Sequence, residues 1–242
     1  MILAIDAGNT RLKWGWHDGA RWTSLESLEI AQLEALSANP LNDAQEAPTR
    51  IVIANVAGAK IAARLSAWTA GFRVPPHWLR AERTRCGVTN LYDAPEQLGA
   101  DRWAALIAAR KLQAVQPGEC LVVCAGTATT ADMLNAHGEF VGGVILPGRE
   151  LMKAALHRNT GGLPLGTGSV RPAPRNTLDA IESGCMYAQA GAIERMRREL
   201  APHANCLISG GAGRQLLECL PFPAGYVENL VLEGLALVAA GT

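Results

Sequence analysis

The chain has 242 residues, and its 22 basic side chains balance 22 acidic ones, so the formal net charge is zero. With 49% hydrophobic and 18% charged residues, its composition is that of a folded globular protein. A neutral chain is not expected to bind nucleic acid through bulk charge, and no apolar run approaches the roughly 18 residues of a membrane span. We therefore expect neither nucleic acid nor a membrane as a partner.

The N-terminus and the cysteines indicate a cytoplasmic protein. Met1 leads directly into an apolar stretch without a basic segment or a cleavage site, so no signal peptide is expected. The six cysteines are scattered and form no Cys-x-x-Cys motif, which is typical of reduced thiols. The histidines show no metal-ligand spacing.

In the first half of the chain, the apolar residues 2–5 predict a strand, and the alternation over 11–16 predicts a second one after a polar turn. The clearest helix runs from Arg102 to about Gln113. The other expected elements are a helix over 26–36, a loop over 37–50, a short buried strand over 51–56 and a helix over 60–68.

The second half begins with another strand, Gly-containing turn and strand, over residues 120–134. The Gly/Pro-rich residues 160–176 predict a long loop, a kind of segment that is often functional. The other expected elements are a strand over 140–146, a helix over 149–157, a helix over 178–200 interrupted near Gly184 or Gly191, a strand over 206–209, a helix through Leu220 and a closing helix over 228–240.

The two halves start alike. Residues 5–10 (Ile-Asp-Ala-Gly-Asn-Thr) align with residues 123–128 (Val-Cys-Ala-Gly-Thr-Ala), about half the chain length further on. A repeated strand, glycine turn and strand indicates two duplicated α/β domains that face each other across a cleft. We place these domains at residues 1–117 and 118–242.

The first turn, Asp6 to Thr10, is a candidate phosphate-binding loop. Gly8 would let the backbone N–H groups approach phosphate oxygens, and Asn9 and Thr10 add side-chain donors. Asp6 would repel a bare phosphate, but it could hold a magnesium ion. A plain hairpin turn explains the same residues equally well.

Three further segments carry polar groups suited to a ligand. The turn at 126–130 combines Gly126 with three threonines, and its likeness to the first turn favours a phosphate site over a plain threonine-rich strand. For the glycine turn at 209–213, a strand-to-helix connector is nearly as good an explanation as a ligand site. Asp101 precedes a helix, where it is either an N-cap or a base beside the anion-binding Arg102. Tyr92, in the loop upstream, either faces a ligand or packs at a rim.

Four motifs together resemble type III pantothenate kinase, a family related to the Bvg accessory factor. They are Asp-x-Gly-Asn-Thr at residues 6–10, Gly-x-Asp-Arg at 99–102, Gly-Thr-Ala-x-Thr at 126–130 and Gly-Gly-x-Ile-x-Pro-Gly at 142–148. The resemblance implies the superfamily of acetate and sugar kinases, heat-shock ATPases and actin. Its fold is α/β, with two duplicated ribonuclease-H-like domains and a nucleotide cleft between them.

The resemblance also implies a reaction, namely ATP-dependent phosphorylation of pantothenate to 4′-phosphopantothenate, the first step of coenzyme A biosynthesis. Asp101 would be the proton acceptor and Asp6 a magnesium ligand. The implied ATP-binding residues are Asp6, Ala7, Gly8, Asn9, Thr10, Arg11, Leu12, Lys13 and Thr127. The implied pantothenate-binding residues are Tyr92, Gly99, Ala100, Asp101, Arg102 and Thr177, the last near the interface of a homodimer.

The chain departs from this family at Cys124, where an aspartate associated with a monovalent cation is usual. A neutral thiol on a buried strand is a poor ligand for potassium or ammonium. We therefore expect either weak cation dependence or a cation site built from other oxygens. The alternatives are a kinase or phosphatase of the same superfamily that acts on a sugar or acetate, and a nucleotide-binding accessory protein with little or no catalysis.

Overall fold

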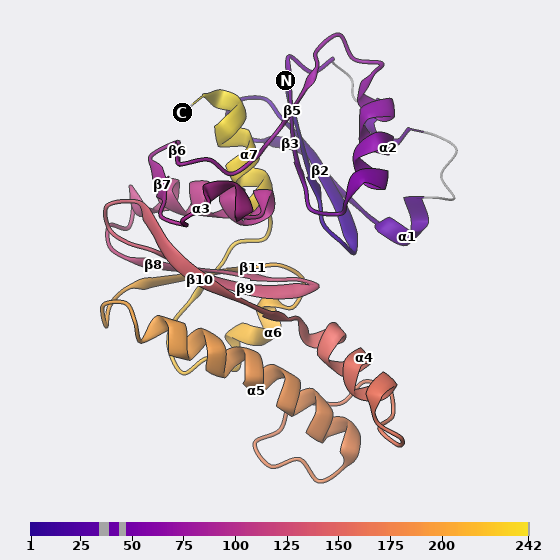
Figure 1. The fold of residues 1–242 in the computed structure, drawn as a ribbon, viewed down its shortest axis with the longest axis vertical. Coiled ribbons are helices and arrows are strands. Elements are labelled where there is room, and N and C mark those ends of the chain that lie inside the picture. The colour runs from indigo at the N-terminus through magenta and orange to yellow at the C-terminus, as the bar shows by residue number, and fades with distance from the viewer. Residues whose placement is uncertain (34–38, 44–46, 242) are drawn as a thin grey trace. The chain divides into compact units, whose positions relative to one another are not determined.

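The computed structural model describes residues 1–33, 39–43 and 47–241 (Figure 1). Contacts divide the chain into two compact units. Unit 1 comprises Met1–Leu112 and Asn229–Thr242, and unit 2 comprises Gln113–Glu228. Among the described residues, no helix is both long and apolar enough to cross a bilayer.

Unit 1 is built on a five-stranded sheet in the order β3-β2-β1-β4-β5. The first three strands pair antiparallel, whereas β4 and β5 continue the sheet in parallel with β1. The strands are β1 (Ile2–Ala7), β2 (Arg11–His17), β3 (Trp22–Glu29), β4 (Arg50–Asn55) and β5 (Pro76–Trp78), with a β6 (Thr84–Arg85) and β7 (Val88–Asn90) hairpin. The helices are α1 (Ile30–Leu33), η1 (Pro40–Asp43), α2 (Ala59–Thr69), η2 (Pro95–Gln97), α3 (Ala100–Gln113) and α7 (Leu230–Ala240).

Residues 2–5 of β1 are all apolar and buried, which is typical of a strand covered on both faces. Leu3 and Ile5 pack in one core with Leu65 of α2, and Figure 1 shows α2 alongside this sheet. The C-terminal helix α7 also belongs to this unit. The Nη1 of Arg50 on β4 donates to the carbonyl of Ala239, and the Nε1 of Trp22 donates to Glu233, 2.7 Å away.

Unit 2 repeats this plan with the strand order β12-β11-β8-β9-β10. β8, β9 and β10 pair antiparallel in chain order, and β11 and β12 extend the sheet in parallel with β8. The strands are β8 (Cys120–Ala125), β9 (Ala128–Leu134), β10 (Glu139–Pro147), β11 (Asn205–Ser209) and β12 (Gly225–Tyr226), and the helices are α4 (Arg149–Asn159), α5 (Thr177–Arg197) and α6 (Gly213–Leu217).

The five sheet strands of unit 2 have the same topology as the five-stranded sheet of unit 1. β1, β2, β3, β4 and β5 of unit 1 correspond to β8, β9, β10, β11 and β12 of unit 2 in order and in relative direction. The glycine turns fall at equivalent places, between β1 and β2 and between β8 and β9. The predicted α/β fold with duplicated ribonuclease-H-like domains is thus confirmed.

Several expected elements differ from the structure. Residues 26–29 end strand β3 rather than begin a helix, because their backbone pairs with β2 from Arg11 to Trp14; residues 34–36 of that predicted helix lie outside the described part. Helix α5 passes Gly184 and Gly191 without a break, and α6 ends at Leu217 rather than Leu220. Contacts group α7 with unit 1, whereas the sequence analysis assigned residues 118–242 to one domain.

Candidate active site

The turn between β1 and β2 is a tight backbone loop. The N–H of Gly8 donates to the carbonyl of Arg11 at 3.0 Å, and a Cβ on Gly8 would lie only 3.3 Å from that oxygen. The side chains of Asn9 and Thr10 are exposed at its tip. The turn therefore offers polar groups to solvent from a fixed backbone.

Asp6 lies at the end of β1, directly opposite Lys13 of β2 in the antiparallel register. The residue keeps some accessible surface, but its carboxyl group is desolvated. Burial first, and the nearby Asp101 carboxylate second, raise the pKa of Asp6 to about 7, whereas the Lys13 ammonium opposes this rise. The Nζ of Lys13 also donates to the Oδ1 of Asn229 at 3.4 Å.

Asp101 lies in the first turn of α3, not at its N-cap as the sequence analysis allowed. The helix begins at Ala100, and the carbonyl of Gly99 accepts the N–H of Trp103 at 2.9 Å. The Oδ1 of Asp101 accepts the N–H of Arg102 at 2.8 Å, a place where the helix dipole favours a carboxylate. A Cβ on Gly99 would come within 2.6 Å of this oxygen, so glycine leaves room for the carboxylate.

Arg102 and Tyr92 form a pair beside Asp101. Arg102 is only 5% exposed, and its Nη2 donates to the hydroxyl of Tyr92 at 3.3 Å. Its guanidinium carbon lies 5.8 Å from the centre of the tyrosine ring, within the range of a cation–π contact. A buried cation and a half-buried aromatic ring are suited to an anionic, partly apolar ligand.

The other predicted site residues of unit 1 differ in exposure. Ala7 and Leu12 are fully buried in the core of unit 1. Arg11 is exposed and donates to Ser27 at 3.2 Å. Ala100, the first residue of α3, is half-buried.

In unit 2, the turn between β8 and β9 carries the exposed Thr127. The N–H of Gly148, just before α4, donates to the carbonyl of Thr127 at 2.8 Å. A Cβ on Gly148 would lie 2.2 Å from the carbonyl oxygen of Gly126, and one on Gly210 would lie 2.4 Å from that of Ala125. Glycines thus allow two other loops of the unit to pack directly on this turn.

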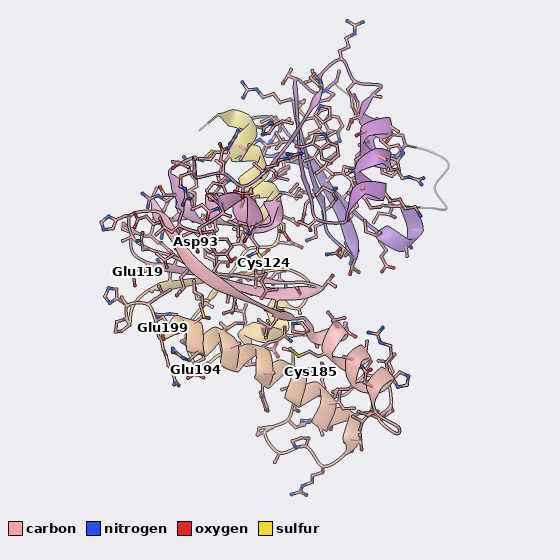
Figure 2. All side chains as sticks on the ribbon, viewed as in Figure 1. Asp93, Glu119, Cys124, Cys185, Glu194 and Glu199 are labelled. Carbon is pink, nitrogen blue, oxygen red and sulfur yellow. The ribbon has the colours of Figure 1, made fainter. Side chains whose placement is uncertain are left out.

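Cys124 is half-buried near the end of β8, at the position that Asp6 occupies on β1, and it is labelled in Figure 2. The strand is buried as expected, but Cys124 is its one half-buried residue, whereas the neighbouring Val123 and Ala125 lie in the core of unit 2. Among the described residues, no group of three or more histidine, cysteine or acidic side chains is positioned to hold a metal ion.

Thr177 is the first residue of α5, after the N-cap Asn176, and its side chain is exposed. It borders an apolar groove of about 710 Å³ between α4 and α5. Leu151 and Ile181 line this groove together with Cys185, which Figure 2 labels on α5. This site is separate in sequence and in unit from the residues around Asp101.

The sequence analysis missed two features. Gly148 was part of a recognised motif, but its contact with the turn of Thr127 depends on folding. Arg83 and Asn90, which hold the loop of Tyr92, lie in no motif that we considered. The only local signal for them is Cys86-Gly87, a two-residue turn with φ of 49° and 74° that is typical of a tight hairpin.

Fold and site together define a class: an α/β protein with two duplicated ribonuclease-H-like domains. A Baf family protein from Campylobacter jejuni has the same fold, with a TM-score of 0.61 and 23% identity over 96% of this chain and 94% of its own. The activator of 2-hydroxyisocaproyl-CoA dehydratase from Clostridium difficile, solved with bound ADPNP, has a TM-score of 0.54 and 12% identity over 98% and 93%.

Sequence comparison gives the family. The family model of type III pantothenate kinase matches residues 2–199. Type III pantothenate kinase from Aromatoleum aromaticum is 54% identical over 99% of this chain and 98% of its own, and that from Azoarcus sp. is 47% identical over 99% and 91%. The chain belongs to the type III pantothenate kinases.

Proposed function

We infer that the chain transfers the γ-phosphoryl group of ATP to the primary hydroxyl of pantothenate, giving 4′-phosphopantothenate in the first step of coenzyme A biosynthesis. The family match over most of the chain carries this inference. It does not favour the alternative of an accessory protein without catalysis, and the paired carboxyl groups of Asp6 and Asp101 agree with an active enzyme.

Asp101 is the proton acceptor in this proposal. An alcohol is too weak an acid to ionise first, so the carboxylate orients the hydroxyl and takes its proton as the bond to phosphorus forms. Arg102 binds the carboxylate of pantothenate, and Tyr92 packs against its apolar part. Gly99 and Ala100 lie at the start of α3 next to Asp101. A substrate bound against them would therefore be close to the Asp101 carboxylate.

Asp6 is the residue that would hold magnesium. Its desolvated carboxyl group lies near a second carboxylate, and an oxygen pair of this kind fits a small, hard cation that keeps several waters. When bound, magnesium neutralises charge on the phosphate oxygens. The backbone and polar groups from Asp6 to Lys13 and the turn of Thr127 position the phosphates of ATP.

Cys124 is a poor ligand for a monovalent cation, because its soft, neutral thiol replaces the hard oxygen ligand that is usual in the family. We expect the activity to change little with potassium concentration. The Cys124→Asp variant should respond to potassium more strongly. Strong activation of the wild type at low millimolar potassium, unchanged in Cys124→Asp, would contradict this assignment.

A homodimer is proposed, and the groove between α4 and α5 is its proposed interface. Leu151 lines this groove and is 41% exposed, and most of the other lining residues are also apolar. Thr177 borders the groove, which agrees with a substrate contact near the interface. A location in the cytoplasm stays a prediction from the sequence.

A coupled assay of ADP release, with and without pantothenate, tests the activity directly. We expect release to require both ATP and pantothenate, and mass spectrometry should detect 4′-phosphopantothenate. A panel of sugars and acetate serves as the control for other acceptors of this superfamily. Equal ADP release without pantothenate, or with a sugar in its place, would overturn the assignment.

A further inference from the structure

The loop that carries Tyr92 is held by Asn90, a fully buried residue at the end of β7. Its Oδ1 accepts the N–H of Tyr92 at 3.0 Å, and its Nδ2 donates to the carbonyl of Pro95 at 3.0 Å. The amide therefore spans the loop from inside. A buried amide bonded in this way fixes the backbone on both sides of it.

Arg83 holds the same loop from outside. Its Nη1 donates to the carbonyls of Asn90 at 2.7 Å and Tyr92 at 3.1 Å, and its Nη2 reaches the carbonyl of Asp93 at 3.4 Å. Asp93 is labelled in Figure 2. A planar guanidinium can bind several carbonyls at once, which an ammonium group cannot do in the same geometry.

The β6–β7 hairpin explains how Arg83 meets this loop. Thr84 pairs with Thr89 and Arg85 with Val88 across the turn at Cys86-Gly87. The next bond outward joins the N–H of Asn90 to the carbonyl of Arg83 at 2.9 Å. The register of the hairpin therefore sets Arg83 directly beside the start of the loop.

We propose that Arg83 is a positioning residue for the phosphoryl acceptor. It acts through the carbonyls of residues 90, 92 and 93, which set the ring and hydroxyl of Tyr92 against Arg102. The proposal rests on the assigned role of Tyr92 and Arg102 in binding pantothenate. It predicts an effect of Arg83 on pantothenate binding and none on ATP binding.

Steady-state kinetics of Arg83→Gln test the proposal. We expect the KM for pantothenate to rise about tenfold, the equivalent of about 1.4 kcal/mol, while kcat and the KM for ATP stay within about twofold. Arg83→Lys keeps the charge but loses the fork, so its KM should also rise by several-fold. A wild-type KM for pantothenate in Arg83→Lys would overturn positioning by the guanidinium, because it would show that a positive charge alone is sufficient.

Arg85→Gln is the matched control, because Arg85 lies on the same hairpin but pairs with the exposed Glu82. We expect wild-type constants for this variant. Thermal melting of all variants checks that they fold, and Arg83→Lys carries the test if Arg83→Gln does not. A rise in both KM values, or a fall in kcat alone, would overturn the proposal.

A double-mutant cycle separates this inference from the function on which it rests. Tyr92→Ala alone should raise the KM for pantothenate, and Arg83→Gln should add less than twofold in that background. An unchanged KM in Tyr92→Ala would refute the assigned role of Tyr92. A raised KM in Tyr92→Ala with a further full tenfold rise from Arg83→Gln would refute positioning through Tyr92 and leave the function intact.

Discussion

Two carboxyl groups of unit 1, Asp6 and Asp101, interact electrostatically, and protonation of Asp6 depends in part on the charge of its neighbour. A pKa of about 7 leaves a substantial fraction of Asp6 protonated near neutral pH. Since a metal ligand must be ionised, we expect magnesium to bind Asp6 more tightly as the pH rises towards about 7, with little further gain at higher pH.

Asp101→Asn should lower kcat by about 10²–10⁴-fold, because the amide keeps the shape of the carboxylate but cannot accept the proton. Circular dichroism should show an unchanged fold. Asp93→Asn, which alters an exposed carboxyl group of the preceding loop, is the control and should retain activity. Near wild-type turnover in Asp101→Asn would exclude it as the proton acceptor.

Asp6→Asn should stabilise the magnesium-free chain at high pH. A carboxyl group whose pKa is raised by folding binds more protons in the folded state, so stability is lost as pH rises from about 4 to about 7. The asparagine variant lacks this loss and should be more stable by about 1–3 kcal/mol at pH 8, with little difference at pH 4. Urea unfolding at both pH values measures the difference.

Magnesium supplies the second half of this test. It should raise the melting temperature of the wild type at pH 8 and leave that of Asp6→Asn nearly unchanged, since a ligand stabilises only the state that binds it. Parallel pH profiles of stability for the two proteins would show that Asp6 is not the group with the shifted pKa. Equal stabilisation by magnesium would show that Asp6 is not the magnesium ligand.

The glycines beside the turn of Thr127 let neighbouring segments pack directly against its backbone. Gly148 has φ of −69°, which alanine adopts without strain, so any loss in Gly148→Ala comes from the contact with Gly126. We expect a loss of about 1–3 kcal/mol in stability and a higher KM for ATP.

Gly191→Ala is the control for that substitution. Gly191 is exposed on α5 and an added Cβ would meet nothing within 4 Å. Alanine should therefore stabilise the helix by up to about 1 kcal/mol and leave the KM for ATP unchanged. Chemical unfolding and ATP titrations of both variants provide the comparison, and equal behaviour would contradict the role of the close contact.

Local signals explain which parts of the fold could be predicted from the sequence. The turns at Gly8 and Gly126 and the apolar patterns beside them are visible within a few consecutive residues. The flanking strands and the duplication could therefore be predicted. Residues 26–29 could not be assigned in this way, because the pairing of β3 with β2 outweighs their helical spacing. The short strands β5 and β12 depend likewise on partners distant in sequence.

The site also contains residues that could be predicted from the sequence and features that could not. Asp101 and Arg102 belong to a motif of the family, and the resemblance also implied Tyr92, so all three could be listed in advance. The raised pKa of Asp6 could not, because it comes from burial and from a carboxylate on a different element. Arg83 was also missed, since its role lies in carbonyl contacts that sequence does not display.

At the scale of the whole molecule, the proposed dimer predicts a specific sensitivity. Leu151→Glu places a charge in the apolar groove of unit 2 and should give a monomer of 25.6 kDa with reduced activity. Leu112→Glu alters a side chain of similar exposure, 40% against 41%, outside that groove and should remain dimeric. Light scattering measures the mass, and an intact Leu151→Glu dimer would refute this interface.

The packing of α7 has a consequence for how the protein is made. Residues 230–240 leave the ribosome after all of unit 2, yet Gly234 packs so closely on α3 that a Cβ would lie 1.9 Å from the carbonyl oxygen of Ala104. Unit 1 therefore lacks one of its helices while unit 2 is being synthesised. The half that is translated first is completed last, and the carboxyl groups of Asp6 and Asp101 belong to that half.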